Sequence, residues 1–202
     1  MSYLQRITTV NGHPLAEVVS ALQKSIRRGL LDDALYFATD MYQTGYAEYA
    51  WKRLRIIASE DVGLANQYLP ATIQALYETW QSVLKKKDLY QAPERLFFVH
   101  AVCLLATSPK NRMVDDALVH HFGSHEQLKR NIPDYALDRH TSKGRGMGRG
   151  VEHVFEVGYA LAHEVGDNPY RERARQTELD AAANPKTKAV KQPESDEQAE
   201  LF

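Results

Sequence analysis

The 202-residue chain has one cysteine, no long hydrophobic run and a net charge of only −1. A single cysteine, Cys103, cannot form an internal disulfide, which suits a reducing compartment. No stretch reaches the about 18 consecutive apolar residues of a membrane span, so we expect a cytoplasmic protein without a membrane partner. The low net charge excludes bulk attraction to nucleic acid, and any such binding would require a local basic patch.

Apolar residues make up 44% of the sequence and recur at helical spacing over most of it. The run 93–107 is apolar nearly all round, which predicts a central buried helix and a buried thiol at Cys103. No alternating strand pattern competes with the helical one. The sequence therefore predicts an all-α fold, a compact bundle or collar of about seven to eight helices. The predicted helices cover 15–26, 31–42, 47–58, 70–84, 93–107, 112–122, a short segment after 124, and 152–164.

The character of the sequence changes in its last third. Beyond about residue 170, apolar residues are scattered among charged residues, alanine and proline. Such a segment cannot offset its ordering entropy, so we expect a disordered tail with at most a fraying helix before residue 183. We accordingly predict a helical domain over 1–166 and a flexible tail over 167–202.

Residues 139–150, RHTSKGRGMGRG, form a glycine- and arginine-rich loop without any acidic residue. Glycines allow backbone amides to approach a phosphate closely, and such a loop suits DNA contacts that do not read the base sequence. It lacks the Gly-Lys-Ser/Thr ending of a nucleotide-binding Walker A loop. The alternative is a structural loop whose arginines pair with acids of a neighbouring helix or subunit. The candidate phosphate-binding residues are Arg139, Lys143, Arg145 and Arg149.

We find no pattern that indicates a catalytic or metal-binding site. Three histidines are close in sequence, but Gly123 breaks the predicted helix between them, so they would not share one face as zinc ligands do. These are His120, His121 and His125. We therefore expect a non-enzymatic protein without a metal or cofactor. An enzyme that acts on nucleotides or nucleic acid, with the glycine- and arginine-rich loop as its phosphate site, is the least favoured alternative.

Two segments have an unusually specific order of residues: ALQKSIR at 21–27 and IASEDVGLA at 57–65. Together they resemble the C-terminal region of AAA+ ATPases of the RarA/MgsA type, whose eukaryotic relative is the Werner-helicase-interacting ATPase. The resemblance is strongest over 20–66 and continues weakly to 110. The matched residues, which the resemblance assigns to structure or to an interface, are Lys24, Ser25, Arg27, Ser59, Glu60, Asp61 and Gly63.

In that family the helical region follows an ATPase module and holds the subunits together as a tetramer. The present chain begins where the ATPase module would have ended, so the resemblance implies no ATP hydrolysis here. It implies a helical fold, a tendency to form homo-oligomers and a role in replication or repair. From its position in the sequence, the pair Glu60–Asp61 is most simply interpreted as a helix cap, a salt-bridge partner or an interface group.

The segment 198–202, QAELF, resembles the pentapeptide that binds the bacterial sliding clamp. A flexible tether would deliver Leu201 and Phe202 to a preformed pocket, while the amide of Gln198 fixes the register. The alternative is a tail that happens to contain a Leu-Phe pair.

These features predict a non-catalytic accessory protein of DNA replication, recombination or repair. We expect it to oligomerise through its helical body, contact DNA through the glycine- and arginine-rich loop and reach the sliding clamp with its tail. The alternative is an adaptor subunit that uses the same helical surface to bind a separate AAA+ ATPase or clamp loader.

Overall fold

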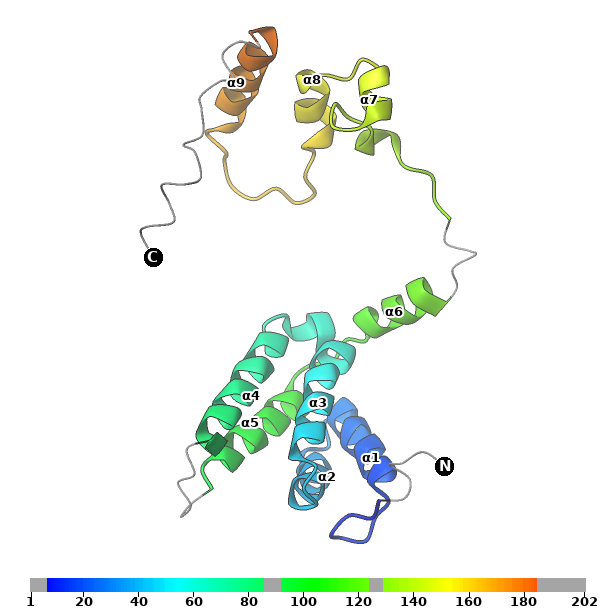
Figure 1. The fold of residues 1–202 in the computed structure, drawn as a ribbon, viewed down its shortest axis with the longest axis vertical. Helices are drawn as coiled ribbons and strands as arrows, with labels where there is room; N and C mark the ends of the chain where they lie inside the picture. The colour runs from blue at the N-terminus through cyan, green and yellow to red at the C-terminus, as the bar shows by residue number, and fades with distance from the viewer. Residues whose placement is uncertain (1–6, 86–91, 124–128, 185–202) are drawn as a thin grey trace, which may run out of the picture. The chain divides into compact units, whose positions relative to one another are not determined.

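The computed structural model describes residues 7–85, 92–123 and 129–184. Within these ranges the chain is helical and contains no strand, which confirms the all-α class; Thr8 and Pro14 form an isolated antiparallel bridge. The chain divides into two compact units, 1–128 and 129–202 (Figure 1). No helix in the described part of the chain is both long and apolar enough to cross a membrane.

The first unit is a helical bundle from which one further helix, α6, projects (Figure 1). Helix α3 continues directly into a π-helical turn, η2, and a short 3₁₀ turn, η3. The elements of this unit are α1 (Leu15–Arg28), α2 (Leu31–Gln43), α3 (Ala47–Ile57), η2 (Ala58–Val62), η3 (Gly63–Asn66), α4 (Leu69–Lys85), α5 (Glu94–Thr107) and α6 (Met113–Gly123).

Aromatic side chains from three helices meet at the centre of the bundle. Trp51 of α3 is fully buried, and its ring centroid lies 5.5 Å from that of Phe98 on α5 and 5.9 Å from that of Trp80 on α4. Offset and edge-on aromatic pairs of this kind add to the burial of their large apolar surfaces. The three helices are therefore fixed against one another, and α3 holds its continuation η2 in place.

The apolar sequence of α5 predicts a helix that is buried on every side, but the structure leaves one of its faces exposed. Phe98 and Val102 face the core, but Leu96 is 68% exposed and Val99 is 38% exposed. The prediction of a buried Cys103 is also wrong, because this residue is half-buried. A helix that is apolar on every side carries no periodic signal for which face meets the core, so the sequence could not distinguish one covered face from two.

The second unit is built from short helical turns and one longer helix, α9. Its small core contains Leu137, Val151 and Val154. The elements are η5 (Asp134–Ala136), α7 (Ser142–Gly146), α8 (Val151–His153), the π-helical turn η6 (Val154–Gly158) and α9 (Arg171–Ala183). The single helix predicted over 152–164 is thus replaced by α8 and η6, which end at Gly158.

The observed division of the chain does not coincide with the predicted boundary at residue 166. Helix α9 belongs to the second unit, where Glu178 pairs with Arg139 at 2.9 Å and Arg175 pairs with Glu156 at 3.5 Å. These partners lie too far apart in sequence for a composition argument to link them. The predicted disordered tail beyond residue 184 lies outside the described residues.

Candidate functional site

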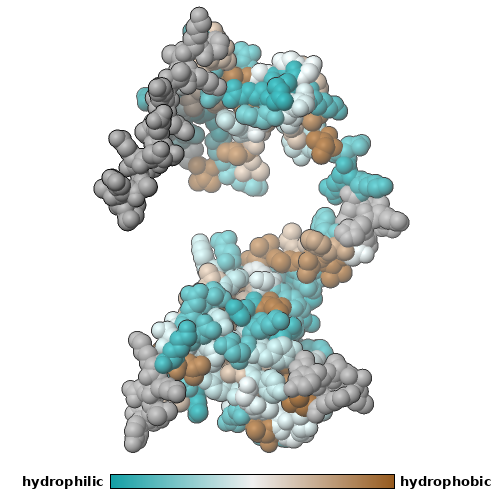
Figure 2. Space-filling view, in the orientation of Figure 1, coloured by the Kyte–Doolittle hydropathy of each residue, from teal (hydrophilic) through white to brown (hydrophobic). Residues whose placement is uncertain are grey.

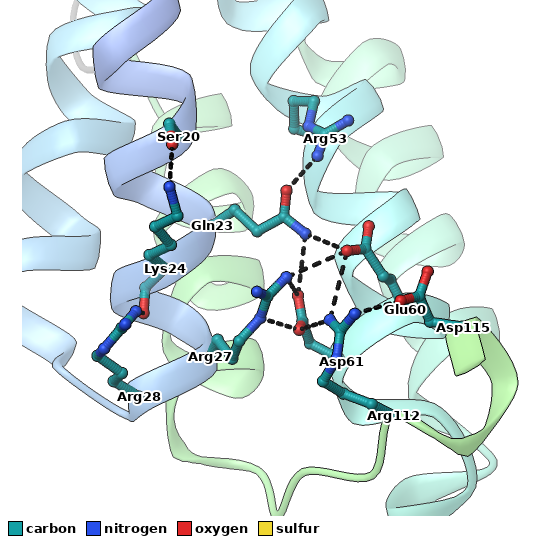
Figure 3. A network of polar contacts seen from close by, with 10 residues as sticks. All are labelled: Ser20, Gln23, Lys24, Arg27, Arg28, Arg53, Glu60, Asp61, Arg112 and Asp115. Atoms are coloured by element: carbon teal, nitrogen blue, oxygen red, sulfur yellow. Dashed lines mark hydrogen bonds and ion pairs between the residues drawn. The ribbon is translucent and has the colours of Figure 1, made fainter. Parts of the chain in front are cut away.

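A buried carboxylate, Asp61, is the centre of a polar network between α1, η2 and the start of α6 (Figure 3). Its side chain has no solvent exposure, and its Oδ1 accepts hydrogen bonds from Nε of Arg27 at 2.5 Å and Nη1 of Arg112 at 2.9 Å. The hydrogen bond from Arg112 raises the pKa of this arginine above its usual value. Two permanent cations thus compensate the buried negative charge, as burial of a charge requires.

Glu60 completes the network from its partly exposed side (Figure 3). Its Oε1 accepts from the same two arginines, and its closest donor is Nε2 of Gln23 at 2.7 Å. Gln23 in turn accepts a hydrogen bond from Arg53, and Arg112 also pairs with Asp115. Arg27 and Arg112 thus contact the carboxylates of the network directly, whereas Arg53 reaches it only through Gln23.

The backbone around Gly63 brings the start of α6 to this network. Gly63 has φ +50°, and a Cβ at this position would lie 2.5 Å from the carbonyl oxygen of Asn111. The amide of Asn111 donates to the carbonyl oxygen of Asp61 at 2.9 Å. Only glycine allows this close approach. The π-helical turn and the glycine together place Arg112 next to Asp61, and π-helical turns are frequent at functional sites.

Lys110 fixes the connection between α5 and α6 from the other side. Its Nζ donates to the carbonyl oxygens of Leu105 at 2.9 Å and Ala106 at 3.1 Å, which closes the C-terminal end of α5. Burial lowers the pKa of Lys110, and the nearby carboxylate of Asp61 opposes this shift. The contacts of Lys110 and Arg112 with the bundle together fix the direction in which α6 leaves it.

Beyond this anchored base, α6 is uncovered in the described structure. It packs mainly on η2 and η3, and none of its residues is buried. Large apolar side chains are exposed along it: Leu118 is 54% exposed, Val119 64% and Phe122 71%. Figure 2 shows the resulting apolar surface over α6. A contiguous exposed apolar surface on a short helix is typical of an interaction site.

A groove with a volume of about 450 Å³ lies between α3 and the base of α6. Ile56, Val114 and Leu118 supply its apolar part, and Lys52 and Arg55 stand on the α3 side. The remaining lining residues are Ser59, Glu60 and Asp115.

The residues that the family resemblance singled out are placed as follows. Arg27, Glu60 and Asp61 meet in the network, so the interpretation of Glu60 and Asp61 as salt-bridge partners is confirmed. Gly63 lies beneath the start of α6. The other three do not join the network: Lys24 donates to Ser20 Oγ, Ser25 is buried in α1 and Ser59 lines the groove.

Sequence reasoning missed Gln23, Arg53, Arg112 and Asp115. The two arginines lie on or beside predicted helices, where a basic side chain is ordinarily solvated. Arg112 lies 51 positions from Asp61, and no local pattern indicates a pair at that separation.

The glycine- and arginine-rich loop uses its arginines within the second unit. Arg149 donates to both carboxylate oxygens of Asp134 at 2.6 and 2.8 Å, and to the carbonyl oxygen of Leu137 at 2.7 Å. Arg139 pairs with Glu178, and Arg145 donates to the carbonyl oxygens of residues 139 and 140. Lys143 is exposed and has no partner among the described residues. These contacts favour the structural alternative for the loop.

Replacing Arg149 with alanine should destabilise the second unit by about 1–3 kcal/mol, because it removes the donor to the partly buried carbonyl oxygen of Leu137. Lys143→Ala should leave stability unchanged. Hydrogen exchange of peptides from 129–184 in increasing urea measures both. Equal protection in the two variants would contradict a structural role for Arg149.

Several predicted residues cannot be placed. Gln198, Leu201 and Phe202 lie outside the described residues, as does His125. Among the residues that are described, no three His, Cys, Asp or Glu side chains are grouped so that they could hold a metal ion.

Comparison with known proteins gives the chain its family. The model of the MgsA AAA+ ATPase C-terminal family matches residues 30–193. The chain belongs to this family. The match confirms the family resemblance stated from the sequence, begins after the segment 21–27 and extends the core predicted at 20–110 to residue 193.

Three similar proteins are each longer than this chain. Replication-associated recombination protein A of Haemophilus influenzae is 28% identical over 173 residues, which cover 83% of this chain and 36% of that protein. An uncharacterised AAA domain-containing protein of Mycobacterium tuberculosis is 32% identical over 154 residues, 75% of this chain and 31% of that protein. Replication-associated recombination protein A of Bacillus subtilis is 28% identical over 148 residues, which cover 71% of this chain and 33% of that protein. The chain thus spans about a third of the length of these relatives.

Proposed function

We propose that this chain is a non-catalytic assembly module that acts in replication-associated recombination and joins copies of itself through α6. The observation that carries the proposal is the exposed apolar surface of this helix on an anchored base. The names of the relatives from Haemophilus influenzae and Bacillus subtilis supply the context of recombination at replication.

The geometry of α6 supports association between copies. A helix of 11 residues is marginally stable by itself in water, and here only its first turn is tied to the bundle. Pairing with a second copy would cover Leu118, Val119 and Phe122, and would stabilise the helix. Because Arg112 already fixes the direction of α6, the orientation of the helix is set before binding, and only the ordering of its outer turns costs conformational entropy.

The mass of the chain in solution tests this proposal. Sedimentation equilibrium should show a defined oligomer, a tetramer if the chain follows its family. The double variant Val119→Ser, Phe122→Ser should weaken association at least tenfold, because about 1.4 kcal/mol of lost apolar burial already has that effect. Val165→Ser, at a position 94% exposed in the second unit, is the matched control and should assemble like the wild type.

A wild-type chain that stays monomeric at high concentration would contradict self-association. If that monomer formed a complex with a separate AAA+ ATPase, the adaptor alternative would replace the proposal. Binding of the sliding clamp by Gln198, Leu201 and Phe202 and direct contact with DNA through the loop stay predictions from sequence.

A further inference from the structure

A second set of cations lies around the network without joining its ion pairs. Lys24 and Arg28 lie about one turn apart on α1, and Lys52 and Arg53 are consecutive residues of α3. Arg53 and Gln23 join the two helices by a hydrogen bond, and Figure 3 shows Lys24 and Arg28 on the α1 side of the network and Arg53 on its α3 side. Lys52 lines the groove that borders the network. These four cations together form the α1–α3 basic surface.

The fold does not compensate the charges of this surface. Lys24 donates to the hydroxyl of Ser20 at 2.7 Å, Arg28 donates to the carbonyl oxygen of Lys24 at 3.1 Å, and Arg53 donates to a side-chain amide oxygen of α1. All three acceptors are neutral, and none of the four cations forms an ion pair with a residue that the structure describes. Because Lys24, Arg28 and Lys52 are also exposed, their charges are open to a ligand.

The acidic residues of the same elements do not neutralise the surface. The three carboxylates of the network pair with its own two arginines. The one acid of α1, Glu17, lies about two turns before Lys24. The one acid of α3, Glu48, accepts a hydrogen bond from the hydroxyl of Tyr77 on α4 at 2.8 Å. The α1–α3 basic surface is therefore a local concentration of positive charge on a chain whose net charge is only −1.

The polar composition of the surface favours phosphate groups over a protein partner. No large apolar side chain of α1 is exposed, whereas a protein interface has an apolar centre. Lysine and arginine, with serine and glutamine beside them, are the side chains that contact phosphate oxygens in nucleic-acid complexes. We infer that the α1–α3 basic surface binds the phosphate backbone of nucleic acid without reading the base sequence.

This site is distinct from the two surfaces described above. The glycine- and arginine-rich loop uses Arg139 and Arg149 for ion pairs inside the second unit. The apolar side chains assigned to self-association lie on α6, and none of them belongs to the basic surface. All four cations come from one copy of the first unit, so the inference does not depend on self-association.

A short fluorescein-labelled DNA duplex, titrated with the full chain at about 0.1 M salt, tests the inference by fluorescence anisotropy. Charges more than about 10 Å from the bound phosphates are largely screened under these conditions. The double variant Lys24→Glu, Lys52→Glu should therefore lower the affinity at least tenfold. The matched control is Lys85→Glu, Lys143→Glu, which changes the net charge equally at two exposed lysines outside the surface and should lower it less than about threefold.

The salt dependence supplies a second readout, which a general loss of charge on the protein would not move. Replacing Lys24 and Lys52 with glutamine removes two phosphate contacts, so the slope of log affinity against log salt should become shallower by about two. Unchanged slopes, no DNA binding by the wild type, or equal losses in the two glutamate variants would each overturn the inference. Polyglutamate that competes as well as unlabelled DNA at equal charge would overturn it in favour of an acidic protein partner. The difference between the two glutamate variants should persist when Val119→Ser and Phe122→Ser are added to both.

Discussion

Asp61→Ala should destabilise the first unit by about 3–5 kcal/mol, the usual loss when one partner of a buried ion pair is removed. The carboxylate of Asp61 has no solvent exposure. Without it, Arg27 loses the acceptor of its shortest hydrogen bond, and Arg112 loses the only fully buried carboxylate that it contacts. The two arginine side chains are 31% and 34% exposed, so water can rehydrate them in part. We therefore expect a value in the lower half of that range.

Urea unfolding followed by tryptophan fluorescence measures this effect, because Trp51 and Trp80 both lie in the first unit. Asp116→Ala is the matched control, since this carboxylate on α6 is exposed and its removal should change stability by less than about 0.5 kcal/mol. Asp61→Asn keeps the shape of the side chain but loses its charge, and its free energy of unfolding should lie between those of the two alanine variants. Equal stability of Asp61→Ala and Asp116→Ala would show that the network does not hold α6 to the bundle.

Gly144→Ala should unfold most of the second unit. A Cβ at this position would lie 2.5 Å from the carbonyl carbon of Asp138 and 2.7 Å from its nitrogen, and closer still to its carbonyl oxygen. These are backbone atoms, which cannot turn aside as a flexible side chain does. We expect a loss of about 3 kcal/mol or more, at the upper end for overpacking, in a unit whose small core provides little stability to spare.

Gly146→Ala is the matched control in the same loop, because no atom lies within 4 Å of the added methyl group. Hydrogen exchange of peptides from 129–184 should show fast exchange for Gly144→Ala and wild-type protection for Gly146→Ala. Similar protection in both variants would contradict a packing role for Gly144. The pair of variants also separates packing from phosphate contact as the reason for glycine in this loop.

Most of the helical architecture could be predicted because it follows from apolar spacing. The predicted segments at 15–26 and 31–42 match α1 and α2 closely. The π-helical turn at 58–62 could not be predicted, since one widened turn leaves the apolar spacing almost unchanged. The boundary between the units was also missed, because ion pairs over long sequence separations attach α9 to the second unit.

The candidate site was predicted only in part. Arg27, Glu60 and Asp61 were singled out by resemblance to a family, and no spacing rule would have joined them across more than 30 positions. Arg112 received no functional role, because an arginine beside a helix start is ordinary. The exposed face of α6 was not predicted either. An apolar stripe in a sequence shows that a helix has something to bury, and only the structure shows that α6 is left uncovered.

Concentration-dependent hydrogen exchange of α6 tests self-association through this helix most directly. In dilute wild-type protein, the amides of 116–123 should exchange rapidly, since every residue of this part of α6 is exposed. At high concentration the same amides should become protected, and the Val119→Ser, Phe122→Ser variant should gain no protection. Exchange in α6 that does not change while the measured mass rises would contradict the account, because the copies would then meet through another surface.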